Sequence, residues 1–244
     1  MRLLLGSGGL RTAARQAVYF EEMSALFEDC EEILFIPYAG KNHSQYTKRI
    51  ADFSEPSGVN IRGIETFENP LDAIKNAQGL YVGGGNTFLL NSFLHANNLL
   101  EIVHKRVFDG MPYMGVSAGA NVACPTMQTT NDMPIVQPLS FSAFNLVPFQ
   151  INAHYHDGNI WMKNGDSFHE HYGETRAQRI REFHEHNTQP VIGLCEGSFL
   201  RWTGETGILL GGDATVFHQG MDPIIYNPGT IFDLSTKSYP LAIY

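Results

Sequence analysis

The sequence predicts one α/β domain over residues 1–244, with a mostly parallel sheet flanked by helices and antiparallel hairpins near the C-terminus. Two observations predict this fold class. Short apolar runs alternate with stretches of helical period, which is the pattern of repeated β-α units. The chain has 244 residues, of which 43% are apolar, so it can bury a substantial core and is not a disordered chain.

The first half of the chain reads as alternating strands and helices. The expected strands are apolar runs at 3–5, 33–36, 59–64, 80–82 and 113–116. The expected helices have a period of about 3.6 and cover 13–29, 46–53, 70–77, 87–97 and 99–108. Pro70 suits the first turn of its helix, and Asn86 is a favoured capping residue.

The pattern changes in the second half of the chain. We expect a strand that ends at His154, a charged helix over 175–187 and a strand over 191–194. Two apolar arms then flank a glycine-containing turn within 199–210, and shorter apolar runs follow. We expect these last segments, which include 215–217 and 224–226, to form antiparallel strands that close one edge of the sheet.

Charge and cysteine content exclude several classes of protein. The net charge of −9 argues against nucleic acid and against a polybasic membrane-surface site, because both rely on lysine and arginine. No apolar stretch approaches the roughly 20 residues that span a bilayer. The three cysteines are widely spaced, so we expect no disulfide framework and a cytoplasmic location.

Residues 115–119 match the G-x-S-x-G pattern of a nucleophile elbow. An apolar strand precedes the motif and small residues follow it, so a tight strand-to-helix turn would present the Ser117 hydroxyl at the carboxyl edge of the sheet. The alternative is a glycine-rich turn with a passive serine. We interpret Ser117 as the nucleophile.

A serine nucleophile needs a base within hydrogen-bond reach, and His154 is the leading candidate among ten histidines. His154 and His156 share one strand face, so a metal site is the competing interpretation. No HExxH motif or cysteine-rich set accompanies them. We therefore expect no metal and no cofactor.

A third group should orient the imidazole, and two acids compete for that role. Asp132 lies in a polar loop after the elbow helix, whereas Glu196 follows the strand over 191–194. Topology favours Glu196 slightly, because that strand should end at the same sheet edge as Ser117. Both acids remain candidates at this point.

Three glycines at 83–85 end another expected strand at the same edge. The backbone N–H groups of Gly84 and Gly85, together with that of Ala118, suit an oxyanion hole. Phosphate binding is the alternative, but no Walker lysine follows these glycines, and residues 6–11 fail the G-x-G-x-x-G pattern at its last position.

Arginines are concentrated in the expected helix over 175–187 of this acidic chain. Arg176 and Arg179 are three residues apart and share a helix face. Because a guanidinium pairs with carboxylate through a planar fork, either residue could bind a substrate carboxylate. The alternative is an ordinary solvated helix face.

Several runs resemble the peptidase E family in sequence and order. They include residues 82–88, 117–121, 123–126, 151–154 and 173–176, and above all the specific run Thr-Thr-Asn-Asp-Met-Pro at 129–134. The resemblance covers roughly residues 1–218. It implies a class I glutamine amidotransferase-like fold and a cytosolic serine peptidase that acts, without a metal, on dipeptides with an N-terminal aspartate.

The resemblance carries residue roles with it. It implies Ser117 as nucleophile and His154 as base, and it matches both Asp132 and Glu196 to acids of the family's active site. We also expect substrate contacts from residues inside the matching runs, which are Asn86, Thr87 and Asn152.

The chain departs from the family in three places. Ala153 stands where bacterial members have proline. The stretch 155–172 is longer and richer in histidine than the corresponding stretch of those relatives, and the C-terminal sequence differs from theirs. These departures leave open the substrate range and whether the protein is a monomer or a homodimer. Alternative functions are a cyanophycinase-like or isoaspartyl peptidase, or an inactive ligand-sensing module.

Overall fold

The computed structural model describes residues 1–158, 160–171, 173–234 and 242–243. The elements up to the elbow are β1 Arg2–Gly6, α1 Ala13–Leu26, β2 Ile33–Ile36, α2 His43–Ser54, β3 Ile61–Gly63, α3 Pro70–Asn76, β4 Leu80–Val82, α4 Thr87–Ala96, α5 Leu99–Phe108, β5 Tyr113–Val116 and α6 Ala118–Ala123. The elements after it are β6 Gln150–Tyr155, β7 Ile160–Asn164, β8 Ser167–His171, α7 Arg176–Phe183, β9 Val191–Cys195, β10 Phe199–Thr203, β11 Thr206–Leu210, β12 Ala214–Phe217, β13 Ile224–Tyr226, β14 Ile231–Asp233 and β15 Ala242–Ile243.

The large sheet has nine strands in the order β15-β14-β11-β10-β1-β5-β4-β2-β3. From β1 to β3 every neighbouring pair is parallel, and from β1 to β15 every pair is antiparallel. The expected fold class, a parallel sheet flanked by helices with antiparallel C-terminal strands, is confirmed. The parallel strands all deliver their carboxyl ends to one edge, where α/β folds bind ligands.

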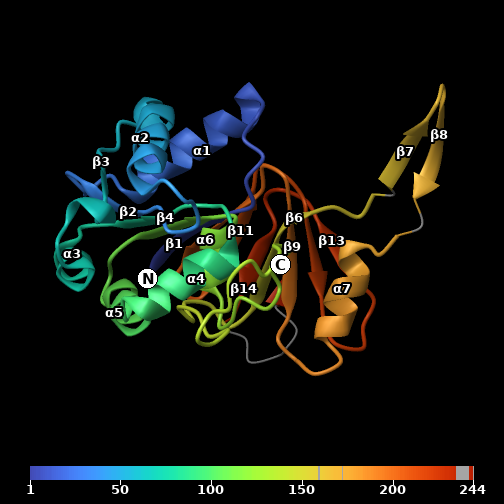
Figure 1. The fold of residues 1–244 in the computed structure, drawn as a ribbon. Coiled ribbons are helices and arrows are strands. Elements are labelled where there is room, and N and C mark those ends of the chain that lie inside the picture. Colours follow the sequence, from blue (N-terminus) through green and yellow to red (C-terminus); the bar gives the residue numbers. More distant parts are fainter. Residues whose placement is uncertain (159, 172, 235–241, 244) are drawn as a thin grey trace.

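Helices cover both faces of the parallel half, as Figure 1 shows. Side chains alternate along each strand, so Leu3 and Leu5 join one buried cluster and Leu4 joins the other. The first cluster includes residues of α4 and α5, and the second includes Tyr19 of α1. We refer to these as the α4 face and the α1 face of the sheet.

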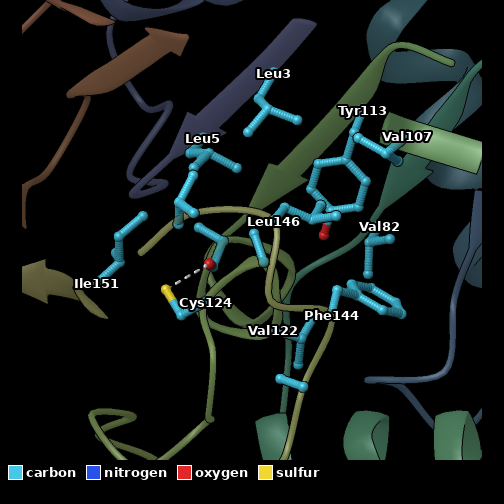
Figure 2. Packing of buried hydrophobic residues seen from close by; sticks show 14 of the residues in the cluster. Leu3, Leu5, Val82, Val107, Tyr113, Val122, Cys124, Phe144, Leu146 and Ile151 are labelled. Atoms are coloured by element: carbon cyan, nitrogen blue, oxygen red, sulfur yellow. Dashed lines mark hydrogen bonds between the residues drawn. The ribbon is translucent and has the colours of Figure 1, made fainter. Parts of the chain in front are cut away.

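The core of the α4 face surrounds the elbow helix α6. Figure 2 shows Val82, Tyr113 and Phe144 packed around this helix, with Cys124 close by. Cys124 is completely buried, and burial raises the pKa of its thiol above the ordinary range, so it is a packing residue and not a nucleophile. This packing fixes the helix that follows Ser117.

A second sheet of four strands, in the order β13-β12-β9-β6, lies beside the first. Its β6 and β9 are parallel, and β12 is antiparallel to both β9 and β13. The expectation that residues 215–217 and 224–226 close an edge of the large sheet is therefore wrong. Apolar alternation shows that a segment is a strand but does not specify its partner.

Two further differences concern residues 155–187. The sequence analysis assigns no structure to 155–172, whereas the chain forms the β7–β8 hairpin, which projects from the body in Figure 1. Helix α7 ends at Phe183, four residues before the expected end, and His184 is its C-cap. Within the described residues, no helix is long and apolar enough to cross a membrane.

Candidate active site

Ser117 occupies a strained turn between β5 and α6. Its backbone has φ 57° and ψ −112°, which a non-glycine residue rarely adopts. Two glycines permit the turn: a Cβ on Gly115 would lie 2.4 Å from the Gly119 carbonyl oxygen, and one on Gly119 would lie 2.1 Å from that of Val82. The turn presents the hydroxyl at the carboxyl edge of the parallel strands, as the motif predicts.

His154 reaches Ser117 from the second sheet. Its Nε2 lies 2.8 Å from the Ser117 Oγ. The pairing of β6 with β9 shifts register between Asn152 and Tyr155, and within this bulge His154 has φ 56°. A bulge changes the direction of a side chain along a strand, which is how β6 turns this imidazole toward the serine.

Glu196 completes the line of side chains. It follows β9, the parallel neighbour of β6, and its Oε1 lies 2.9 Å from the His154 Nδ1. The other carboxylate oxygen of Glu196 is buried and has no hydrogen-bond partner within the described residues. A carboxylate, an imidazole and a hydroxyl thus stand in the order that a serine hydrolase requires.

Asp132, the other candidate acid, does not contact the imidazole. Its Oδ2 accepts hydrogen bonds from the Thr87 N–H at 2.7 Å, the Thr87 hydroxyl at 2.6 Å and the Thr130 hydroxyl at 3.1 Å. Asp132 therefore satisfies the amino end of α4, where a negative charge is favourable. Of the two candidate acids, Glu196 is the one whose carboxylate contacts the His154 ring, and a catalytic role for Asp132 stays a prediction.

The glycines after β4 lie against the serine. A Cβ on Gly84 would be 3.0 Å from the Ser117 Cβ and 3.4 Å from its Oγ, so any side chain at this position would crowd the serine. Within the described part of the chain, the N–H groups of Gly84, Gly85 and Ala118 donate to no acceptor. Three unpaired donors beside a nucleophile suit a developing oxyanion.

The two arginines of α7 differ in their surroundings. Arg179 is exposed, and its Nε lies 2.7 Å from the Glu174 Oε2. Arg176 is half-buried and makes no ion pair or hydrogen bond with any described residue. Burial and then the charge of Arg179 lower the pKa of Arg176, while the charge of Asp132 raises it. Arg176 is therefore a cation near Asp132 that has no ion-pair partner in the described part of the chain.

Three expected substrate contacts are already engaged within the protein. Thr87 is fully buried, and the Asn152 amide nitrogen donates to the Thr129 carbonyl at 2.8 Å and to the Asn131 Oδ1 at 2.9 Å. The Asn86 side chain caps α4 and donates to the Met133 carbonyl. Thr87 and Asn152 are buried and position the loop that carries Asp132, and substrate contact by the three residues stays a prediction.

The loop after β1 contains a residue of the site, Ser7, that no sequence motif predicted. Ser7 is fully buried, and its hydroxyl donates to the Leu194 carbonyl at 2.9 Å and accepts from the His154 N–H at 2.8 Å. The loop follows a buried parallel strand and is rich in glycine, which is a signal for a functional loop at the sheet edge.

The competing metal interpretation paired His154 with His156. His156 is exposed, whereas both ring nitrogens of His154 are engaged, by Ser117 and by Glu196. Among residues 1–158, 160–171, 173–234 and 242–243, no three His, Cys, Asp or Glu side chains are grouped closely enough to hold a metal ion.

Known proteins share both the sequence and the fold. The model of peptidase family S51 matches residues 2–210. Peptidase E of Streptomyces coelicolor is 46% identical over 192 residues, which cover 78% of this chain and 76% of that relative. The protein of Drosophila melanogaster named probable alpha-aspartyl dipeptidase is 42% identical over 200 residues, which cover 79% of this chain and 80% of that protein.

A solved structure extends the likeness beyond sequence. The crystal structure of a peptidase from an acI-B1 Actinobacterium superposes with a TM-score of 0.68 at 14% identity, over 95% of this chain and 96% of that one. At that identity the likeness concerns the fold alone. With the family model and the relatives in agreement over most of the chain, this protein belongs to peptidase family S51 and is a serine-type peptidase.

Proposed function

We propose that this protein is an α-aspartyl dipeptidase that hydrolyses Asp-X dipeptides. The observation that carries the proposal is the continuous line from Ser117 Oγ through the His154 imidazole to Glu196, with contacts of 2.8 and 2.9 Å. The substrate class comes from the names of the relatives, and a free, half-buried Arg176 near the site supports it.

In the proposed mechanism, the His154 Nε2 takes the proton of the Ser117 hydroxyl as its Oγ attacks the carbonyl carbon of the aspartyl residue. The Glu196 carboxylate accepts a hydrogen bond from the His154 Nδ1–H, which fixes the tautomer and stabilises the imidazolium that forms. The N–H groups of Gly84, Gly85 and Ala118 stabilise the oxyanion of the tetrahedral intermediate.

The imidazolium of His154 then protonates the departing amine, and the bond between the two residues of the dipeptide breaks. The aspartyl group remains as an ester on Ser117. Water, deprotonated by His154, attacks this ester, and the serine oxygen recovers its proton as free aspartate leaves.

Recognition of the aspartate side chain is assigned to Arg176. A carboxylate must lose water to enter the site, and a guanidinium that has no ion-pair partner among the described residues offsets that cost. Arg179 is less suited, because Glu174 already pairs with it and the pair is exposed. Asparagine lacks the charge, so an Asn-X dipeptide would leave Arg176 unpaired.

The experiment compares dipeptides that differ in one feature. The purified protein should hydrolyse Asp-Leu and should be at least about thirtyfold slower, in kcat/KM, on Asn-Leu and Glu-Leu. Turnover of β-linked isoAsp-Leu in place of Asp-Leu would favour an isoaspartyl peptidase instead. No turnover, together with no labelling of Ser117 by a fluorophosphonate, would favour an inactive ligand-binding module.

We also infer that the protein works as one domain in the reducing cytoplasm. Its three cysteines are free thiols. Burial raises the pKa of the Cys195 thiol, which makes it less reactive. Purification in the absence of reductant should leave activity unchanged, whereas loss of activity that dithiothreitol restores would contradict this inference.

A further inference from the structure

Residues 6–9, at the end of β1 and directly after it, make hydrogen bonds to Ser117, to His154 and to Gly197, the neighbour of Glu196; we call this segment the β1 loop. The Ser117 N–H donates to the Gly6 carbonyl at 2.8 Å. The His154 N–H donates to the Ser7 hydroxyl, also at 2.8 Å. The Gly197 N–H, next to Glu196, donates to the Gly8 carbonyl at 2.8 Å. One short segment therefore holds the backbone of all three regions.

Ser7 holds the backbone at the point where strain is stored. His154 has φ 56° inside the bulge of β6, a conformation that costs free energy and persists only where surrounding contacts fix it. The fully buried Ser7 hydroxyl accepts from the His154 N–H and donates to the Leu194 carbonyl on β9. Ser7 thus joins the two strands that carry the base and the acid.

The glycines of the β1 loop fit against the side chains of the same residues. A Cβ on Gly8 would lie 2.8 Å from the His154 Cε1. A Cβ on Gly9 would lie 2.1 Å from the Glu196 Oε2, the buried oxygen that has no hydrogen-bond partner among the described residues. Gly9 also has φ 68°, which favours glycine. The loop therefore limits where the imidazole and the carboxylate can move.

We propose that the β1 loop positions the catalytic base, with Ser7 as the positioning residue for His154 and Gly9 as the contact that seats Glu196. This inference rests on the proposed roles of Ser117, His154 and Glu196. Ser7 touches no reacting atom in this scheme. It acts by holding the imidazole in line with the serine hydroxyl, and displacement of a catalytic group by about 1 Å can cost about 100-fold in rate.

The test compares Ser7→Ala with Ser198→Ala. Ser198 is also fully buried, and its hydroxyl donates to the Asp213 carbonyl at 2.7 Å without touching His154. Ser7→Ala should lower kcat on Asp-Leu, and the rate at which a fluorophosphonate labels Ser117, by about 10- to 100-fold with KM nearly unchanged. Ser198→Ala should lower the melting temperature but leave both rates within about twofold.

Glycine substitutions give a second, independent test. Gly9→Ala should lower the labelling rate of Ser117 at least about tenfold, because the methyl group displaces the Glu196 carboxylate. Gly58→Ala is the matched control: Gly58 has φ 73°, and its added Cβ would meet nothing within 4 Å. It introduces the same backbone strain without the contact, so it should leave the labelling rate unchanged.

The labelling rate separates this inference from the substrate assignment. A wild-type protein that labels but does not cleave Asp-Leu would overturn the proposed substrate and leave the positioning test valid. Ser7→Ala protein that labels at the wild-type rate, or Gly9→Ala and Gly58→Ala proteins that slow equally, would overturn the role of the β1 loop. A wild-type protein that does not label would overturn both proposals.

A separate observation concerns a cavity of about 620 Å³ that is lined by Gly84, Gly85, residues of α2 and the segment just before α2. Lys41, Lys48 and Arg49 bring positive charge to it in a chain of net charge −9. Lys48 pairs with Asp52 at 2.8 Å, whereas Lys41 and Arg49 form no ion pair within the described residues. The cavity thus offers two cations that form no ion pair among the described residues, Lys41 and Arg49, of which Arg49 lies over the Tyr46 ring at 4.9 Å from its centroid.

This cavity and Asp132 lie by different helices at the sheet edge. Asp132, whose charge acts on Arg176, is bonded to the first residue of α4 on the α4 face. The cavity lies by α2, whose Tyr46 packs with the α1 face and donates to the Gly84 carbonyl at 2.7 Å. Gly84, which lines the cavity, also lies beside Ser117. A dipeptide whose scissile carbonyl is at Ser117 could therefore extend its leaving residue into the cavity.

We infer that Lys41 and Arg49 bind the free C-terminal carboxylate of the leaving residue. This inference also rests on the proposed function, and it explains a preference for dipeptides, because only a dipeptide has that carboxylate one residue beyond the scissile bond. Both cations are exposed, so each should contribute only about two- to fivefold in KM.

The test uses Asp-Leu and its C-terminal amide, which differ only in that charge. The K41M/R49M double variant should raise KM for Asp-Leu about five- to twentyfold and leave the amide unchanged. Lys48→Met, at the paired lysine of the same cavity, should change neither. Equal losses on both substrates, or no loss on Asp-Leu, would overturn the subsite, and wild-type protein that cleaves neither substrate would overturn the aspartyl assignment with it.

Discussion

The parallel half of the large sheet and the four-stranded sheet contribute to the site in different ways. The parallel half carries Ser117 and the glycines after β4 on adjacent strands, each at the end of a short apolar run. The four-stranded sheet carries His154 and supports Glu196, which are 42 residues apart in sequence and meet only because β6 and β9 pair. One region is thus specified by local motifs and the other by strand pairing.

This difference affects how each region tolerates change. The elbow depends on close backbone approaches, such as that of Gly119 to the Val82 carbonyl. These approaches occur between the ends of the neighbouring strands β4 and β5. The His154–Glu196 contact depends instead on a bulge and on the β1 loop between the sheets. A substitution in the elbow should therefore remove the attacking group itself, whereas a substitution in the four-stranded sheet should remove the support of the base.

The largest effect is expected at the elbow. Ser117→Ala removes the attacking oxygen, so kcat on Asp-Leu should fall by at least about a thousandfold and up to about 10⁶-fold, as for other triads. The fold should persist, because one oxygen is lost from a turn of small residues, and thermal unfolding would check this. Pure variant protein with more than about a tenth of wild-type activity would contradict the nucleophile assignment.

The next effect tests the four-stranded sheet. Glu196→Gln keeps the shape of the side chain but removes the charge that stabilises the imidazolium and fixes its tautomer. We expect kcat to fall by up to about 10⁴-fold with little change in KM, measured by steady-state kinetics on Asp-Leu. If kcat is unchanged, Ser117 and His154 act as a dyad. The pairing of β6 with β9 would then position His154 but would add no catalytic acid.

A smaller effect is expected from the arginines that lie outside both regions. Arg176→Met should lower kcat/KM for Asp-Leu by roughly 30- to several thousandfold and narrow the preference over Asn-Leu. Arg179→Met is the matched control on the same helix, and because Arg179 is exposed and paired with Glu174 it should have little effect. Equal losses in both variants would argue against a specific role for Arg176.

The smallest effect is expected at Asp132. Asp132→Asn weakens the acceptor of three hydrogen bonds at the start of α4, so the free energy of unfolding should fall by about 1 kcal/mol. Chemical denaturation would measure this change. If Asp132→Asn lowers kcat as much as Glu196→Gln does, in folded protein, then Asp132 contributes to catalysis although it makes no contact with His154.

Much of the fold and part of the site could be predicted from the sequence. The strands and helices of the first half follow from apolar periodicity, and the elbow follows from small residues on both sides of Ser117. The β7–β8 hairpin was not predicted, because its strands pair only with each other and present exposed apolar residues such as Trp161 and Phe168. Its sequence therefore lacks the alternation of a half-buried strand.

The sequence by itself predicted Ser117 as the nucleophile and the glycines at 83–85 beside it, since both follow neighbouring parallel strands of one sheet, and it predicted His154 as the base. Only the tertiary structure decided between Glu196 and Asp132 and brought Ser7 into the site. The physical reason is that a carboxylate orients an imidazole through a contact of 2.9 Å, and such a contact depends on how β6 pairs with β9. No local pattern of residues fixes which strands pair, because alternation defines the faces of a strand but not its neighbour.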